Sequence, residues 1–199
     1  MNVLWFTGRR FDNFCSTTQA SLAAGIIRQG HSVHILNPDE QGSHIGKEWK
    51  HTGFSMSSIP GLQSRKLSKD MKVWILHNKF DENTVAIVDW RVLNHIHRAL
   101  ESKKIPWIMM DRSPPADRGI LAKLQWPKWN KAWAKAIRGT VVSEAHRQFV
   151  VDYTQTPKAS IGVIPAGVDL DLFQHGEKDG PIRMVYHGRV DVNRGVMSL

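Results

Sequence analysis

The sequence predicts an α/β protein built on a doubly wound parallel sheet. Short apolar runs that suit buried strands alternate with longer segments in which apolar residues recur every three or four positions, as on one face of a helix. A strand, a helix and a second strand follow one another between Val3 and Asn37, which is the extent of one βαβ unit. This alternation favours a sheet covered by helices on both faces, with ligands bound outside the carboxyl ends of the strands.

The first βαβ unit has the clearest signals. Val3–Thr7 is an apolar run that ends at Gly8, as expected of a buried parallel strand. Ser16-Thr17-Thr18-Gln19 has the Ser-x-x-Gln spacing of a capping box, so a helix should begin there and end near Gly30. His31–Asn37 is the second predicted strand.

The pattern repeats after a polar, loop-like stretch from Asp39 to Ser58. Val73–Leu76 is predicted to be a strand, and four apolar residues at four-residue spacing predict the next helix: Val88, Val92, Ile96 and Leu100. The remaining predicted elements are the strand Trp107–Met110, the helix Gly119–Ile137, the strand Thr140–Val142, the helix Glu144–Val151 and the strand Ser160–Ile164.

Composition and charge narrow the class of protein. The 199 residues, 41% of them hydrophobic and 23% charged, suffice for one α/β domain with a well-buried core and leave a few residues over. No apolar run is long enough to span a bilayer, and no secretory signal precedes the first strand. The single cysteine, Cys15, can form no internal disulfide, which favours a reducing cytoplasm. No spacing typical of metal ligands is present, so no metal site is predicted.

The formal charge of +9 indicates an anionic partner. Nucleic acid, an acidic membrane surface and phosphorylated small molecules all fit that charge.

Residues that follow the predicted strands are candidates for ligand binding. In chain order they are Gly8, Arg9 and Arg10; His77 and Asn78; Asp111 and Arg112; and Ser143 and Glu144. Some have a purely structural alternative: Ser143 can cap the following helix, His77 can bond to backbone at a strand end, and Gly8 can serve turn geometry alone.

The predicted helix Gly119–Ile137 is amphipathic. Between Asp117 and Glu144 there is no acidic residue but six cations, namely Arg118, Lys123, Lys128, Lys131, Lys135 and Arg138. At about 100° per residue, one side carries Trp126, Trp129, Trp133 and Ile137, and the other Lys128, Lys131 and Lys135.

Two interpretations of this helix stay open. Its tryptophans can be core and its lysines solvated. Alternatively its basic face, joined by Arg65, Lys66, Lys69 and Lys72, meets anionic headgroups at the inner face of the membrane. Nucleic acid is less favoured, because the tryptophans follow a helical face and no known nucleic-acid-binding motif occurs.

Three further segments carry a family resemblance. They are RQGHSVHIL (Arg28–Leu36), VIPAGVDLDLF (Val163–Phe173) and VYHGRVDVNRGV (Val185–Val196). Together they resemble the GT-B nucleotide-sugar glycosyltransferases, particularly the retaining group that includes phosphatidylinositol mannosyltransferases and sucrose and glycogen synthases. The segments are similar, in order, to that family's Gly-His turn and second strand, its last N-terminal strand with the turn into the linker, and the opening of its second domain.

The resemblance implies a Rossmann-like sheet that is the N-terminal half of a two-domain GT-B architecture. It divides the chain into an acceptor-binding domain (1–174), a linker (175–181), and the first strand and start of a helix of a donor-binding domain (182–199). Because the family places most nucleotide contacts further along the chain, these 199 residues alone are expected to be inactive.

The resemblance also implies a set of site residues. The donor diphosphate would be held by the positions that match the family's Gly-Arg and Lys-Gly pairs: Gly188, Arg189, Arg194 and Gly195. A solvated pair of arginines is the alternative. Gly8, Arg9, Arg10 and His77 are the acceptor-binding candidates. Asp111, at a loop where several relatives carry a sugar-contacting His, is the catalytic candidate; it can equally cap the turn before Pro114 and Pro115.

The implied reaction transfers a sugar from a nucleotide-diphosphate sugar to a hydroxyl acceptor, with retention and without a separate cofactor. Arg9 and Arg10 would suit an anionic acceptor. The alternatives are another GT-B enzyme, such as a sugar-nucleotide epimerase or a phosphorylase, and a non-catalytic module that binds anionic lipid or RNA.

Overall fold

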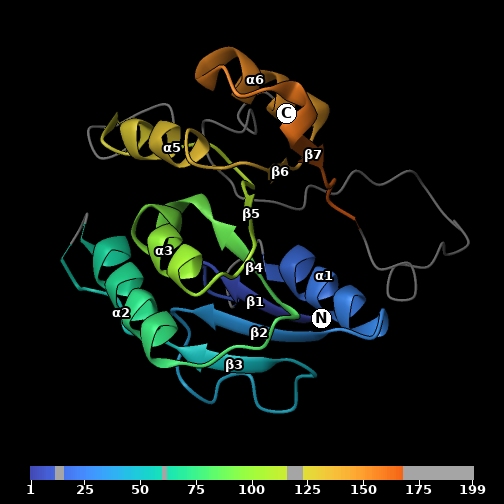
Figure 1. Cartoon of the computed structure of the whole chain (residues 1–199), viewed down its shortest axis with the longest axis vertical. Helices are drawn as coiled ribbons and strands as arrows, with labels where there is room; N and C mark the ends of the chain where they lie inside the picture. Colours follow the sequence, from blue (N-terminus) through green and yellow to red (C-terminus); the bar gives the residue numbers. More distant parts are fainter. Residues whose placement is uncertain (12–15, 60–61, 116–122, 168–199) are drawn as a thin grey trace, which may run out of the picture. The chain divides into compact units, whose positions relative to one another are not determined.

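The computed structural model describes residues 1–11, 16–59, 62–115 and 123–167. Within this part of the chain, seven parallel strands form one sheet in the order β3-β2-β1-β4-β5-β6-β7 (Figure 1). The strands are β1 (Asn2–Phe6), β2 (Ser32–Asn37), β3 (Lys50–Gly53), β4 (Thr84–Asp89), β5 (Trp107–Met110), β6 (Gly139–Val141) and β7 (Ile161–Val163). The helices are α1 (Ser16–Arg28), α2 (Gln63–His77), α3 (Trp90–Ser102), α5 (Trp126–Trp133) and α6 (Glu144–Thr154), with a short 3-10 turn at Lys158–Ser160. The predicted α/β class is confirmed.

The sheet is doubly wound because the order of the strands reverses at β1, which pairs with β2 on one side and β4 on the other. Helix α1 links β1 to β2 and packs Ala23 against one face of the sheet. Helices α2 and α3 cover the opposite face (Figure 1). Ligand sites in such sheets lie at the reversal point, outside the carboxyl ends of the strands.

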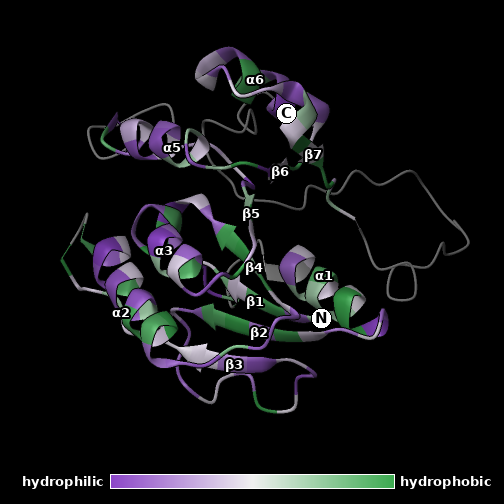
Figure 2. Ribbon diagram, viewed as in Figure 1, coloured by the Kyte–Doolittle hydropathy of each residue, from purple (hydrophilic) through white to green (hydrophobic). Residues whose placement is uncertain are grey.

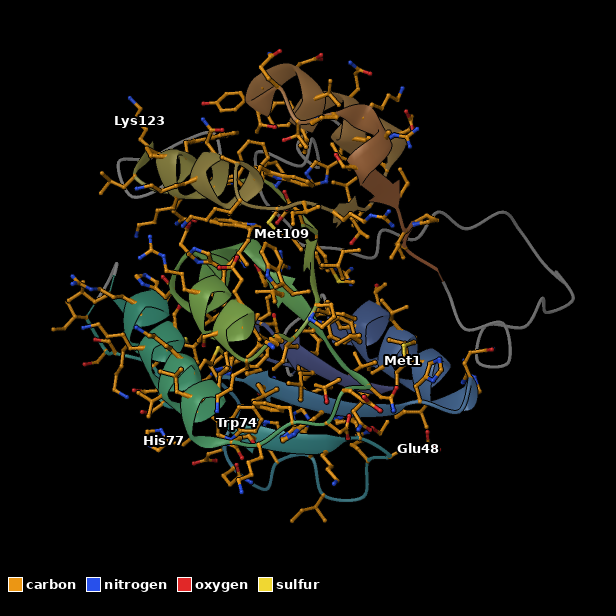
Figure 3. The ribbon with its side chains drawn as sticks, in the orientation of Figure 1. Met1, Glu48, Trp74, His77, Met109 and Lys123 are labelled. Carbon is orange, nitrogen blue, oxygen red and sulfur yellow. The ribbon has the colours of Figure 1, made fainter. Side chains whose placement is uncertain are left out.

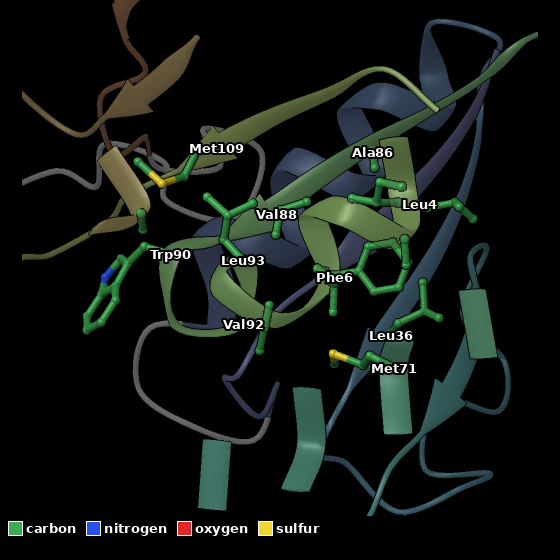
Figure 4. Packing of buried hydrophobic residues seen from close by; sticks show 14 of the residues in the cluster. Leu4, Phe6, Leu36, Met71, Ala86, Val88, Trp90, Val92, Leu93 and Met109 are labelled. Atoms are coloured by element: carbon green, nitrogen blue, oxygen red, sulfur yellow. The ribbon is translucent and has the colours of Figure 1, made fainter. Parts of the chain in front are cut away.

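Strand β1 shows why both faces are filled. Val3 and Trp5 belong to the cluster under α1, whereas Leu4 and Phe6 belong to the cluster under α2 and α3. On that second face Phe6 lies near Leu36 of β2 and Met71 of α2 (Figure 4). A strand buried on both faces needs a nearly continuous apolar run, and the central strands are strongly hydrophobic (Figure 2).

Helix α3 begins at a cap supplied by the end of β4. The Asp89 side chain accepts a hydrogen bond from the Arg91 amide (Oδ1 to N, 3.0 Å), which satisfies one of the free amides of the first turn. Val92, Ile96 and Leu100 are fully buried, as the four-residue spacing predicts.

Helix α5 confirms the core interpretation of the tryptophans. Trp129 and Trp133 are fully buried, and Pro127 lies in the first turn. The neighbouring strand β6 makes room for them with Gly139, where a Cβ would lie 2.5 Å from the Trp133 ring. Ile137 was predicted on the same side, but it lies beyond the helix and is 84% exposed.

Two predicted elements are wrong. Val73–Leu76 belongs to α2 and is not a strand, because Leu67, Met71 and Ile75 recur at four-residue spacing and bury one helical face. Val88 belongs to β4, which the sequence interpretation merged with the helix that follows it.

A third element was missed within the predicted loop. Strand β3, Lys50–Gly53, is polar and only partly buried, and backbone pairing with β2 defines it. Of the predicted helix Gly119–Ile137 the structure describes α5, and residues 116–122 lie outside the described part.

Candidate functional site

A hydrogen-bonded cluster joins the carboxyl ends of β1, β4 and β5. Thr7, directly after β1, donates to Asp89 at the end of β4 (Oγ1 to Oδ2, 3.3 Å) and accepts from the Arg9 amide (3.1 Å). The Arg9 guanidinium lies 3.9 Å from Asp89 Oδ2 and donates to Ser113 Oγ at 2.8 Å. Arg9 therefore links the loops that follow β1 and β5 at the reversal point, and Asp89 balances its charge. The predicted part for Arg9 in binding an anionic acceptor stays a prediction, which this pairing does not favour.

Gly8 precedes Arg9 in the same loop. A Cβ on Gly8 would meet Arg91 at 3.6 Å, an ordinary contact, and the backbone there does not require glycine. Turn geometry alone thus gives no reason for glycine at this position, whereas close approach of a ligand would.

Asp111 anchors the end of β5. The residue is fully buried; its Oδ2 accepts from the indole nitrogens of Trp129 (2.6 Å) and Trp133 (3.0 Å), and its Oδ1 accepts from the Ser113 amide (3.1 Å). His146 Nε2 lies 3.5 Å away from Oδ2 and has no hydrogen-bond partner among the described residues. The carboxylate therefore caps the turn and ties β5 to α5. Its catalytic assignment stays a prediction that these contacts do not favour.

Ser143 has the structural role that the sequence offered as an alternative, namely that of a helix cap. Its side chain accepts from the His146 amide at 3.1 Å and caps α6.

His77 lies away from this edge. It is the last residue of α2 and lies near Trp74 in Figure 3, and its Nδ1 is 2.8 Å from the Val73 carbonyl oxygen. The next residue, Asn78, accepts from Lys103 at the end of α3, where the chain turns back toward the start of β5. The premise that placed His77 after a strand was wrong, because a helix ends there at the amino edge of the sheet.

A pocket of about 970 Å³ opens beside the reversal point, and we call it the β1–β3 pocket. Its walls come from the loops after β1, β2 and β3 and from Ala20 of α1. The lining residues are Arg10, Phe11, Ala20, Pro38, Asp39, Glu40, Gln41, Ser43, His44, Lys47, Trp49, Gly53, Phe54, Ser55 and Met56. Of the predicted acceptor residues, Arg10 lies in this pocket.

A hydrogen-bond network holds one wall of the pocket. Asp39 accepts from His44 Nε2 (2.7 Å), Asn37 Nδ2 (2.7 Å) and the Phe11 amide (3.0 Å). Burial alone would raise the pKa of Asp39, but these hydrogen bonds outweigh burial and hold that pKa below its ordinary value. Asp39 therefore stays a carboxylate.

The same network assigns the histidine tautomers. Trp49 Nε1 donates to His44 Nδ1 at 2.8 Å, so the proton of a neutral His44 sits on Nε2 and points at Asp39. Asn37 uses its amide nitrogen on Asp39, so its oxygen accepts from His51 Nε2 at 2.9 Å. The His44 and His51 rings stack 3.8 Å apart.

Asp39, His44 and His51 also present three possible metal-ligand atoms within 4.8 Å of one another, which the sequence interpretation missed. Asp39 and His44 lie in the loop after β2 and His51 lies in β3, without a recognisable spacing. His44 Nε2 carries the proton that Asp39 accepts, and a metal there would leave the Trp49 indole without an acceptor. The donor set thus suits a hydrogen-bond network better than a cation.

A separate cationic surface, which we call the cationic helical face, spans α2, α3 and α5. Desolvation lowers the pKa of His95 in α3, and the charges of Arg65, Lys128, Lys135 and Lys69 lower it further, so these four cations act on the same ring. Lys135 Nζ donates to Asn94 Oδ1 at 2.8 Å, and Asn94 Nδ2 donates to the Lys128 carbonyl oxygen at 2.8 Å. The predicted basic face of α5 is therefore continuous with cations of α2.

None of the described helices has the length and apolar character that crossing a membrane requires. The positions Gly188, Arg189, Arg194 and Gly195, and the predicted boundaries beyond residue 167, lie outside the described residues.

The seven-stranded parallel sheet matches the fold of GT-B glycosyltransferase structures. The profile of Glycosyltransferase Family 4 matches residues 16–172, and the chain belongs to that family. No curated protein matches the sequence at a significant level.

Solved glycosyltransferases share the fold. UGT89C1 of Arabidopsis thaliana, complexed with UDP-L-rhamnose, aligns at a TM-score of 0.57 with 13% identity, over 88% of this chain and 56% of its own. The lipopolysaccharide outer core galactosyltransferase WaaB aligns at 0.57 with 12% identity, over 85% and 47%. A glycosyltransferase from Rickettsia africae aligns at 0.56 with 13% identity, over 87% and 45%. The chain spans about half the length of these structures.

Proposed function

We propose that the chain is the acceptor-binding lobe of an enzyme that transfers a sugar from a nucleotide-diphosphate sugar to a hydroxyl acceptor, with retention. The observation that carries the proposal is the family match over residues 16–172 together with the pocket at the carboxyl edge. Two similar structures are described as complexes with UDP-L-rhamnose and with UDP, which supports a nucleotide-sugar donor.

The donor side of the proposal rests on residues beyond the described part. Arg189 and Arg194 would stabilise the departing diphosphate, and Gly188 and Gly195 would let backbone amides approach its oxygens. The proposed domain boundaries stay 1–174, 175–181 and 182–199. The remaining donor contacts would come from a partner lobe, so the 199 residues alone should not turn over donor.

Replacing the phosphate-binding arginine tests this proposal. In a protein that contains both lobes, Arg189→Ala should lower turnover roughly 100-fold or more, since one fixed donor to developing charge is worth about that much. Arg138→Ala removes an exposed cation from the described lobe and serves as the matched control. Turnover equal to wild type in Arg189→Ala would overturn the donor assignment.

The products separate the alternative enzymes. A transferase releases nucleoside diphosphate only when an acceptor is glycosylated, an epimerase returns an altered nucleotide sugar, and a phosphorylase yields a sugar phosphate. Retention is read by NMR from the anomeric configuration of the product.

The cationic helical face supports a second proposal, docking to an anionic membrane surface. Its cations come from α2 and from α5 with Lys135 just after it, and each basic residue near an anionic surface is worth about 1 kcal/mol. A cytoplasmic enzyme held at the inner leaflet in this way would meet lipid-linked acceptors.

Vesicles test that proposal. The triple variant Lys128→Gln, Lys131→Gln and Lys135→Gln should lose most co-sedimentation with phosphatidylglycerol vesicles at low salt. A control that removes three exposed lysines elsewhere, Lys50, Lys79 and Lys104, should keep it. Equal binding by both variants would exclude a specific face, and preference for single-stranded RNA over vesicles would favour the binding-module alternative.

A further inference from the structure

The β1–β3 pocket has nearly balanced charge, although the whole chain carries +9. Its charged lining residues are two cations, Arg10 and Lys47, and two acids, Asp39 and Glu40. His44 adds no charge in the tautomer that Trp49 and Asp39 assign to it. A phosphorylated ligand would therefore meet Asp39, a fixed carboxylate, without a surplus of cations to offset it.

The apolar part of the wall is aromatic and held in place. The Phe11 ring lies 5.3 Å from His44 and 5.9 Å from Trp49, measured between centroids. The Trp49 indole is fixed by its bond to His44, and Lys47 Nζ lies 6.0 Å from its centroid. Phe54 and Met56, after β3, also line the pocket. Rigid aromatic rings offer a flat apolar surface at little cost in conformational entropy.

Polar groups surround this aromatic wall. Glu40, Ser43 and Ser55 are exposed at the pocket, with the Lys47 ammonium beside Trp49. A ligand that fits must present an apolar face to the rings and hydrogen-bonding groups at its edge. Pyranose rings do so, because their C–H bonds gather on one face and their hydroxyls point outward.

We infer that the β1–β3 pocket binds an uncharged saccharide, which is the acceptor or the sugar portion of a larger acceptor. That the saccharide is the acceptor rests on the proposed function. The inference narrows that function to an uncharged acceptor. The anionic partner suggested by the net charge is assigned to the cationic helical face and not to the pocket. A volume of about 970 Å³ has room for more than one sugar ring.

Saturation-transfer NMR on the full chain tests the inference without any donor. The probes are neutral disaccharides of gluco, galacto and manno configuration, with glucose 6-phosphate as the charged comparison. We expect transfer to the ring C–H protons of at least one neutral disaccharide, with a dissociation constant of about 1 mM. Glucose 6-phosphate should bind at least fivefold more weakly.

Two variants fill the pocket from different elements of the fold. Ala20→Trp projects from α1, and Ser55→Trp from the loop after β3; each should weaken saccharide binding at least fivefold. Ser21→Trp is the matched control, because Ser21 is exposed on the same helix and does not line the pocket. Thermal unfolding verifies that all three proteins are folded, and Lys47→Gln probes the polar edge without added bulk.

The outcomes are distinct from those of the transferase test. No transfer to any neutral disaccharide, equal binding by the filled and control variants, or tighter binding of glucose 6-phosphate would each overturn the inference. Saccharide binding that the filled variants abolish supports it even if the two-lobed protein fails to turn over nucleotide sugar. Turnover by that protein without saccharide binding here leaves the proposed function standing and removes this inference.

Discussion

At the scale of single residues, Asp111 shows how chemistry inferred from position can differ from chemistry inferred from contacts. The sequence placed a carboxylate at a loop that often bears catalytic groups, and the structure turns it inward to accept two indole N–H bonds. A signal for this was present, because Trp129 and Trp133 are four residues apart and share a helical face. Their partner could not be predicted, since eighteen or more residues of chain separate it from them.

Asp111→Ala should therefore lower the free energy of unfolding by about 3 kcal/mol or more, because two buried N–H donors lose their acceptor. Urea unfolding followed by tryptophan fluorescence measures the change. Asp152→Ala, which removes an exposed carboxylate of α6 that accepts from Gln148 Nε2, should shift stability by less than about 0.5 kcal/mol. Unchanged stability in Asp111→Ala, with loss of turnover in the two-lobed protein, would restore the catalytic hypothesis.

Two glycines should respond to alanine with opposite signs. At Gly139 a Cβ would lie 2.5 Å from the Trp133 ring, so Gly139→Ala should destabilise the protein by about 1–3 kcal/mol through overpacking. At Gly25, inside α1, the nearest atom to a Cβ is 3.9 Å away, so Gly25→Ala should stabilise by about 0.5–1 kcal/mol. Midpoints of urea unfolding give both values, and a same-signed pair would contradict the packing argument.

At the scale of elements, periodicity predicted those helices and strands whose buried apolar residues are regularly spaced. The β1–α1–β2 unit, the stripe of α3, and strands β5, β6 and β7 follow from apolar spacing and turn residues. The strand prediction for Val73–Leu76 failed because four consecutive apolar residues suit a strand and a buried helical turn equally. Leu67 and Met71 indicate a helix only when a longer stretch of sequence is considered. Strand β3 could not be predicted, because backbone pairing with β2 creates it, not its side chains.

One part of the candidate site could be predicted from regular apolar spacing, and the other could not. The loops after β1 and β5 were predicted from strand ends, but the β1–β3 pocket depends on β3 and on a loop whose polar sequence gives no pattern. Asp39 accepts from His44, Asn37 and the Phe11 amide, and Trp49 joins the network through His44. Hydrogen-bond geometry of this kind is set by tertiary contacts, which spacing in one sequence does not encode.

Helix α6 offers an element-scale test through its cap. Ser143 accepts from the His146 amide, so Ser143→Ala should cost about 1 kcal/mol in unfolding free energy, whereas Ser143→Asp, which keeps an acceptor at the helix start, should cost little. Equal losses in both variants would show that the hydroxyl matters for something other than capping.

At the scale of the whole molecule, partly desolvated histidines make stability depend on pH. Burial, with the charges of Lys50 and His51, lowers the pKa of His34 from its ordinary 6.5 to about 4. Burial and neighbouring charges also lower the pKa values of His51, His95 and His97. Below pH 6.5 the unfolded chain therefore binds protons that the folded protein still excludes, so acid favours unfolding.

The sign follows directly for His34, the most strongly shifted of the four. Its contribution to stability is fully present above pH 6.5 and is lost as the pH falls toward about 4, where the folded ring also takes up its proton. Urea midpoints measured at constant ionic strength from about pH 4.5 to about pH 7.5 should rise with pH and level off above the unfolded pKa of 6.5. His34→Gln keeps a polar side chain opposite Thr52, whose Oγ1 lies 2.8 Å from His34 Nε2, and should flatten that rise. A wild-type midpoint independent of pH would mean that His34 is solvated in the folded protein, and the packing of β2 against Trp74 would need to be revised.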